Sequence, residues 1–107
     1  MYRYRLEKEG FAVRTADNGA SGLQLIKSFA PDLILLDLRM PIMSGDEMLR
    51  LLRAESWASN IKVIVLTNIS KSEAPPMLRF LSVSRYVVKA HTTPHQVTEI
   101  IREVLGL

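Results

Sequence analysis

Three aliphatic runs, each closed by a polar residue, most strongly constrain the fold of this 107-residue chain. They are DLILLD at residues 32–37, IKVIVLT at 61–67 and YVVK at 86–89. Because they lack the polar alternation of a half-exposed strand, they predict strands of a parallel sheet that is covered by helices on both faces. The run FAVRTA at 11–16, interrupted by Arg14, predicts a further short strand at a sheet edge.

Segments of helical spacing separate these strands, at residues 2–10, 20–30, 45–55 and 94–105. Ser44 with Glu47, and Thr93 with Gln96, have the spacing of a capping box and predict two helix starts. Between the last two strands, Pro75 favours a short helix that begins late and ends near residue 81. This alternation of strands and helices is typical of an α/β domain with right-handed crossovers.

The polar residues that close the three strands are the candidate site. Asp37, Thr67 and Lys89 contribute a carboxylate, a hydroxyl and an ammonium group. In open α/β sheets, functional groups gather beyond the carboxyl ends of the strands, so we expect these three side chains to converge. Taken singly, each also has an ordinary structural role: a loop cap, a hydroxyl bonded to main chain, or a solvated charge.

At these positions the chain resembles the receiver domain of bacterial response regulators, the CheY-like family. Pro41 and Gly45 follow Asp37 at the family's spacing, and Tyr86 precedes Lys89 by three residues. The resemblance covers nearly the whole chain. It implies a flavodoxin-like, doubly wound parallel sheet, here with four strands alternating with helices.

The resemblance also implies a function in two-component signal transduction. Asp37 would accept a phosphoryl group from a histidine kinase or phosphotransfer protein, with Lys89 and Thr67 contacting the phosphoryl oxygens. Thr67 and Tyr86 would act as the switch that reshapes a face for a downstream protein target. Such a module is not a classical enzyme, since it catalyses at most its own phosphotransfer and dephosphorylation.

One family element is missing from the sequence. Receivers begin with a buried strand that carries an acidic pair for Mg²⁺, whereas this chain begins within the first helix and is N-terminally truncated relative to the family. The metal site would keep Asp37 and the main-chain carbonyl of Arg39, so we expect weak Mg²⁺ binding. If residues 11–16 closed up against residues 32–37, Asp17 would approach Asp37 and replace part of the pair.

The missing strand also leaves exposed strand edges, which predict self-association. The alternative function is therefore a pseudo-receiver or truncated receiver, which binds partners or forms oligomers without phosphorylation.

Composition narrows the remaining possibilities. The absence of cysteine excludes disulfides and a cysteine nucleophile, and it fits a cytoplasmic location. A net charge of +3, carried by scattered Lys and Arg, does not predict nucleic-acid binding, and the apolar runs are too short to span a membrane. We expect residues 1–107 to form a single receiver domain without an output domain.

Overall fold

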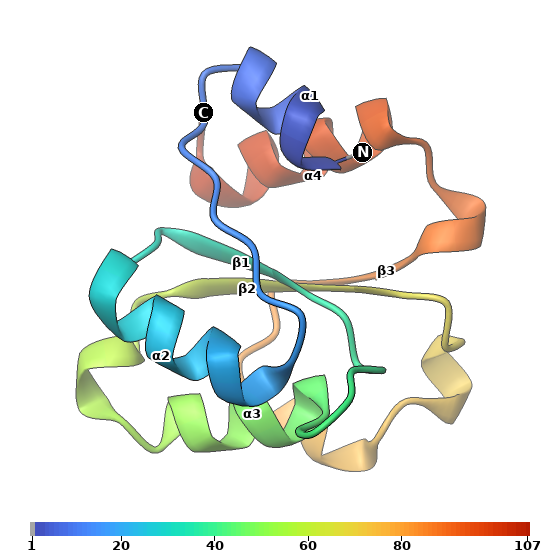
Figure 1. Cartoon of the computed structure of the whole chain (residues 1–107). Coiled ribbons are helices and arrows are strands. Elements are labelled where there is room, and N and C mark those ends of the chain that lie inside the picture. The colour runs from blue at the N-terminus through green and yellow to red at the C-terminus, as the bar shows by residue number, and fades with distance from the viewer. Residues whose placement is uncertain (1) are drawn as a thin grey trace.

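A parallel sheet of three strands forms the middle layer of the computed structural model, which describes residues 2–107 (Figure 1). The strands are β1 (Leu33–Leu36), β2 (Lys62–Thr67) and β3 (Arg85–Val88), in the spatial order β1-β2-β3. Leu36 of β1 lies opposite Val65, and Thr67 of β2 lies opposite Val88. The carboxyl ends of the three strands therefore meet at one rim of the sheet.

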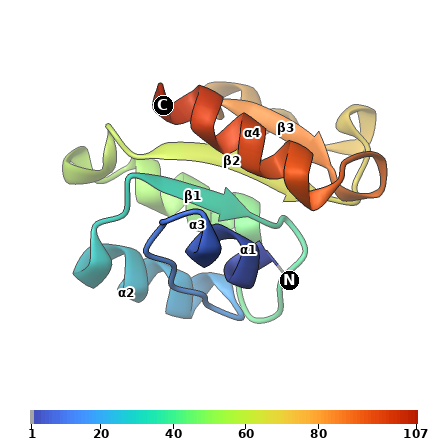
Figure 2. The same ribbon diagram turned by 90° about the horizontal axis from the view of Figure 1, so that it is seen from above.

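Helices cover both faces of this sheet. Helices α1 (Tyr2–Lys8) and α4 (Pro94–Leu105) lie on one face, and α2 (Gly19–Phe29) and α3 (Gly45–Arg53) lie on the other (Figure 1). The view from above shows α4 running over β2 and β3, with α1 beside it near β1 (Figure 2). Short 3₁₀ turns complete the chain: Ser56–Ala58, Lys71–Glu73, Pro76–Phe80 and Lys89–His91.

The prediction of a fourth strand at residues 11–16 is wrong. These residues form no strand, and they pass in front of the sheet from α1 to α2 (Figure 1). A strand needs a neighbour for its main-chain groups, and neither edge of this segment pairs with β1. The guanidinium of Arg14 instead donates to the carbonyl of Val13 at 3.0 Å. Direct closure of this segment onto β1 has therefore not occurred.

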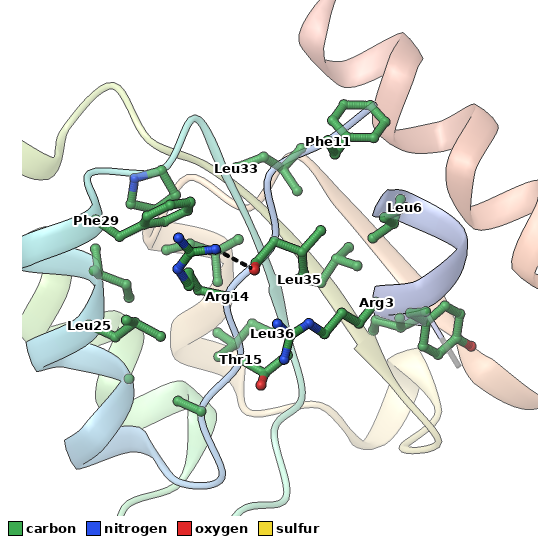
Figure 3. Close-up of a pocket in the computed structure, with 18 of the residues that line it drawn as sticks. Arg3, Leu6, Phe11, Arg14, Thr15, Leu25, Phe29, Leu33, Leu35 and Leu36 are labelled. Carbon is green, nitrogen blue, oxygen red and sulfur yellow. Dashed lines mark hydrogen bonds between the residues drawn. The ribbon is translucent and has the colours of Figure 1, made fainter. Parts of the chain in front are cut away.

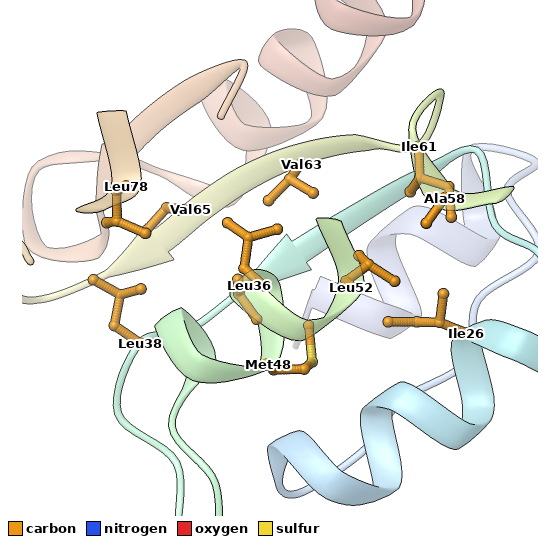
Figure 4. Close-up of a cluster of buried hydrophobic side chains, with 11 residues drawn as sticks. Ile26, Leu36, Leu38, Met48, Leu52, Ala58, Ile61, Val63, Val65 and Leu78 are labelled. Atoms are coloured by element: carbon orange, nitrogen blue, oxygen red, sulfur yellow. The ribbon is translucent and has the colours of Figure 1, made fainter. Parts of the chain in front are cut away.

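The two faces of the sheet carry separate apolar clusters. Strand β2 alternates between them, since Val63 and Val65 point to one cluster and Ile64 and Leu66 to the other. The cluster between the sheet and helices α2 and α3 is the larger, and Figure 4 shows most of it around Met48. Every residue of β2 after Lys62 is buried, as the aliphatic pattern predicts for a central strand.

Two of the predicted helix starts are confirmed, and the third predicted helix is a shorter 3₁₀ turn. Thr93 and Gln96 form the complete capping box of α4, with bonds of 3.1 and 2.8 Å, and the Ser44 hydroxyl accepts from the N–H of Glu47 in α3. The short helix predicted to begin near Pro75 is a 3₁₀ turn that follows Pro75. Adjacent prolines remove two main-chain donors there, which limits the segment to this short form.

Candidate functional site

An ion pair between two strand ends forms the centre of the candidate site. Asp37 follows β1 directly, and Lys89 follows β3 directly. The Lys89 Nζ lies 2.9 Å from Asp37 Oδ2, so the lysine reaches past the end of β2, which separates the two strands. Both side chains are about one-third exposed, at 34 % for Lys89 and 33 % for Asp37. The carboxylate is thus both held in place and open to an incoming group.

The hydroxyl of Thr67 completes the group from the central strand. Thr67 is the last residue of β2 and is 1 % exposed, and its hydroxyl accepts from the N–H of Ile69 at 3.4 Å. The structure therefore brings Asp37, Thr67 and Lys89 to one rim, as their positions at three strand ends predicted.

The surroundings of Asp37 favour its ionised form. Partial burial by itself raises the pKa of this carboxyl, but donated hydrogen bonds outweigh that effect. They come from Lys89, from the main-chain N–H of Arg39 at 3.1 Å to Oδ1, and more weakly from Thr67, and the charge of Lys89 adds to them. The pKa of Asp37 is consequently below its ordinary value, which keeps an anionic oxygen available.

Gly45 fixes the main chain of the Asp37 segment. Its N–H donates to the carbonyl of Leu38 at 3.0 Å, where α3 begins. A side chain at this position would collide with the carbonyl of Asp37. The glycine that follows Asp37 by eight residues is therefore required by close packing of α3 onto the end of β1.

Tyr86 lies near the site, but its hydroxyl hydrogen-bonds to the loop after β2 and not to Asp37, Thr67 or Lys89. Its hydroxyl donates to the carbonyl of Ile69 at 2.7 Å, and its half-buried ring packs against the cluster between the sheet and α3. Burial raises the pKa of the Tyr86 hydroxyl, with a smaller effect from Glu73. Ile69 thus links Thr67 and Tyr86, because its N–H contacts one and its carbonyl the other.

Asn68 is a residue of this rim that the sequence patterns did not single out. Its side-chain oxygen accepts from the N–H of Ala90 at 3.0 Å, so it ties the loop after β2 to the turn that carries Lys89. Its position in the sequence could have indicated this role, because an Asn directly after a strand-ending Thr is well placed to hydrogen-bond a neighbouring loop.

The donors at this rim do not fit a dedicated Mg²⁺ site. Receivers hold Mg²⁺ in an acidic pocket, but residues 2–107 contain no group of three or more acidic or histidine side chains that could hold a metal ion. Both oxygens of Asp37 already accept hydrogen bonds, and Asp17 is exposed at the start of the next turn. With the Arg39 carbonyl, Asp37 would offer one carboxylate where Mg²⁺ needs octahedral oxygen ligation.

The fold is that of an α/β domain of the flavodoxin-like class. The chain belongs to the response regulator receiver domain family, whose sequence model matches residues 1–103. This membership confirms the resemblance and the doubly wound fold, apart from the number of strands. Within residues 2–107, none of the helices is long and apolar enough to cross a membrane.

Some of the relatives are much longer than this chain. It is 36% identical over 98 residues to hybrid signal transduction histidine kinase D of Dictyostelium discoideum, and it covers 6% of that protein. It is 33% identical over 102 residues to the phosphate regulon transcriptional regulatory protein PhoB of Rhizobium meliloti, of which it covers 44%. These alignments take in 90% and 94% of the chain, so it spans less than half of either relative.

Smaller proteins match over most of their length. The polar-differentiation response regulator DivK of Brucella anthropi is 28% identical over 106 residues, which is 99% of this chain and 85% of DivK. The solved signal receiver domain of a Luxo repressor protein from Vibrio parahaemolyticus has a TM-score of 0.84 at 23% identity, covering 98% of this chain and 78% of that one. Chemotaxis protein CheY4 of Vibrio cholerae has the same TM-score at 24% identity, covering 94% and 83%. These two structures support the fold.

Proposed function

We propose that the chain is a phosphoacceptor module that takes a phosphoryl group on Asp37 and changes a protein-interaction face in response. The observation that carries this proposal is the 2.9 Å contact between Lys89 and Asp37 beside the buried Thr67 hydroxyl. A nucleophilic carboxylate next to a fixed cation and a hydroxyl donor is the arrangement that phosphoryl transfer requires.

The proposed reaction uses Asp37 as the nucleophile. One of its oxygens attacks the phosphorus of a phosphohistidine on a histidine kinase or phosphotransfer protein. The new O–P bond forms an acyl phosphate as the P–N bond breaks, and the electron pair of that bond returns to the imidazole nitrogen. Lys89 then offsets charge on the transferred oxygens, and the attacking carboxylate, whose pKa lies below its ordinary value, is ionised at neutral pH.

The proposed switch begins at Thr67. Its hydroxyl would turn toward a phosphoryl oxygen and leave the N–H of Ile69, a long contact at 3.4 Å. Since the Ile69 carbonyl anchors the Tyr86 hydroxyl, movement of this short loop would release or redirect Tyr86. The ring lies beside the turn Pro76–Phe80, so the change would reach a surface able to bind a downstream protein.

The wider setting follows from this role. We propose a cytoplasmic location, a histidine kinase or phosphotransfer protein as the upstream partner, and one receiver domain within residues 1–107. Within residues 2–107, β1 has no strand on its outer edge, and such an open edge also favours self-association.

A specific observation favours the alternative, a pseudo-receiver that binds partners without phosphorylation. Among residues 2–107, Asp37 is the one carboxylate that the rim presents, both of its oxygens are engaged, and these donors do not fit a dedicated Mg²⁺ site. Without a metal to offset charge, Lys89 and Thr67 would be the main stabilising groups for the transferred phosphoryl oxygens. Slow or undetectable transfer is the outcome expected from this alternative.

Intact-mass spectrometry after incubation with phosphoramidate and Mg²⁺ tests the proposal. We expect the chain to gain one phosphoryl group, Asp37→Asn to gain none, and the matched control Asp17→Asn to behave like the parent. Lys89→Met should slow the gain. If the folded parent gains no phosphoryl group, or if Asp37→Asn still gains one, the phosphoacceptor role is wrong and the alternative stands.

A further inference from the structure

Asn68 lies where the ladder of paired residues between β2 and β3 ends. The last pair of this ladder joins Thr67 to Val88. Asn68 and Lys89 are the next residues along the two strands. The side-chain Oδ1 of Asn68 accepts a hydrogen bond from the N–H of Ala90 at 3.0 Å. The amide side chain therefore adds one further bond across the two strands, at the point where the main chain of Lys89 leaves the sheet.

The turn that carries Lys89 is placed relative to β2 by this bond. Residues Lys89–His91 form a 3₁₀ turn, which is closed by a bond of 3.2 Å from the N–H of Thr92 to the carbonyl of Lys89. That internal bond shapes the turn but does not direct it toward any strand. The bond from Ala90 to Asn68 does so, because Asn68 directly follows β2.

The direction of this turn matters because the Lys89 side chain has far to reach. Strand β2 lies between β1 and β3, so the ammonium must pass the end of β2 to come within 2.9 Å of Asp37 Oδ2. A lysine side chain that is 34% exposed has many rotamers open to it, and holding it in one of them costs entropy. A main chain that is fixed next to the lysine narrows the positions that the ammonium can take.

Stability alone does not explain the place of this bond. Asn68 and Ala90 are both exposed, so water can replace the bond at a small net cost in the free energy of folding. Water cannot replace the direction that the bond gives to the turn. The main consequence of the bond is therefore geometric, and it falls on the residue before Ala90, which is Lys89.

We propose that Asn68 is a positioning residue for phosphoryl transfer, which holds the Lys89 ammonium against Asp37 through its bond to the N–H of Ala90. Asn68 acts through Lys89 and not by contact with the reacting atoms. The effect on rate rests on the proposed phosphoacceptor function, whereas the positioning of the lysine is already present before any phosphoryl group arrives.

A carbon NMR titration of the Asp37 carboxyl, without a phosphodonor, measures how closely the ammonium is held. Asn68→Leu keeps the branching of the side chain and removes its accepting oxygen. We expect the pKa of Asp37 to rise toward its ordinary value in this variant, because the carboxylate loses part of the hydrogen bond and charge of Lys89. The matched control Asn60→Leu, at an exposed position in the turn before β2, should leave the pKa of Asp37 unchanged. An unchanged pKa in Asn68→Leu would overturn the proposal.

A double-mutant cycle separates action through Lys89 from a general loss of structure. In the Lys89→Met background, adding Asn68→Leu should leave the pKa of Asp37 where Lys89→Met alone puts it. A further rise of the same size as in the parent background would show that Asn68 acts on Asp37 by another route, which would also overturn the proposal. Circular dichroism melts establish that each variant is folded.

The rate of phosphoryl gain completes the test. With phosphoramidate and Mg²⁺, Asn68→Leu should slow the gain about tenfold, as expected when a charge-neutralising group is displaced by a fraction of an ångström, while Asn60→Leu keeps the rate of the parent. A risen pKa with an unchanged rate would overturn the role in transfer. If the parent itself gains no phosphoryl group, the phosphoacceptor function fails, and the titration still decides whether Asn68 positions Lys89.

Discussion

Strands β1 and β2 have nearly the same sequence character but very different surroundings. Both are continuous aliphatic runs, LILL and VIVL, that lead to a polar residue of the candidate site. In β2, which has a neighbour on each side, five consecutive residues are buried. In β1, with a neighbour on one side, the first three residues are only half-buried, although helices flank both faces. An aliphatic run therefore specifies a strand, while its neighbours determine how completely it is buried.

The largest expected difference between the two strands is in stability. Ile64 of β2 is 1% exposed, whereas Ile34 of β1 is half-buried. Ile64→Ala should lower the free energy of unfolding by about 3–4 kcal/mol, since truncation leaves a cavity in a closed core. Ile34→Ala should cost about 1–2 kcal/mol, because its site already opens toward solvent. Urea denaturation measures both, and equal losses would contradict the contrast between a closed and an open strand.

The next effect concerns how the end of β1 is held. Gly45→Ala should destabilise the protein by about 1–3 kcal/mol, since the new methyl group would push against the carbonyl of Asp37. Gly106→Ala is the control, because Gly106 has a φ of 76° and its added methyl group meets no described atom within 4 Å. Its cost should be about 1 kcal/mol, from backbone strain alone. Gly45→Ala should also slow phosphorylation of Asp37 in the mass assay, and an unchanged rate would show that the contact does not position the carboxylate.

The same contrast explains what the sequence could and could not predict. Local sequence patterns predict the three strands and the helix caps at Ser44 and Thr93. Parallel topology, which follows from the alternation of strands and helices, predicts that Asp37 and Lys89 come together. Whether residues 11–16 form a strand depends on a neighbouring strand outside that segment. A local pattern could therefore not predict its absence. The pocket beside the outer edge of β1 (Figure 3) was likewise hidden, because residues far apart in the sequence line it.

A smaller effect on stability is expected from the ion pair between Asp37, which follows β1, and Lys89. The pKa of Asp37 is lowered in the folded state, so its contribution to stability is present above its pKa in the unfolded chain and is lost as pH falls through the folded value. Lys89→Met should raise the pKa of Asp37 and lower stability at pH 7 by no more than about 1 kcal/mol, as is usual for partly exposed pairs. A carbon NMR titration of the Asp37 carboxyl measures the shift.

Lys62→Met, at an exposed position where β2 begins, is the control for this titration and should leave the pKa of Asp37 unchanged. An unchanged pKa in Lys89→Met would mean that the 2.9 Å contact does not persist in solution.

The smallest effect lies in the loop after β1. Ile42 has a φ of 69° and is 85% exposed, an unfavourable conformation for a β-branched residue with little packing to offset it. Ile42→Gly should stabilise the protein by up to about 1 kcal/mol, since relief of strain exceeds the entropy cost of glycine. Ile42→Val keeps the strain and should leave the melting temperature unchanged. Destabilisation by Ile42→Gly would show that this side chain makes contacts that matter for folding.

Amide hydrogen exchange measured residue by residue tests the central contrast most directly. Ile64 and Val65 pair with both neighbouring strands, so we expect strong protection throughout the middle of β2. In β1, protection should alternate along Leu33–Leu36, because successive N–H groups point toward β2 and toward the outer edge, where no strand of residues 2–107 lies. Uniform protection of β1 in the free, monomeric protein would contradict the account.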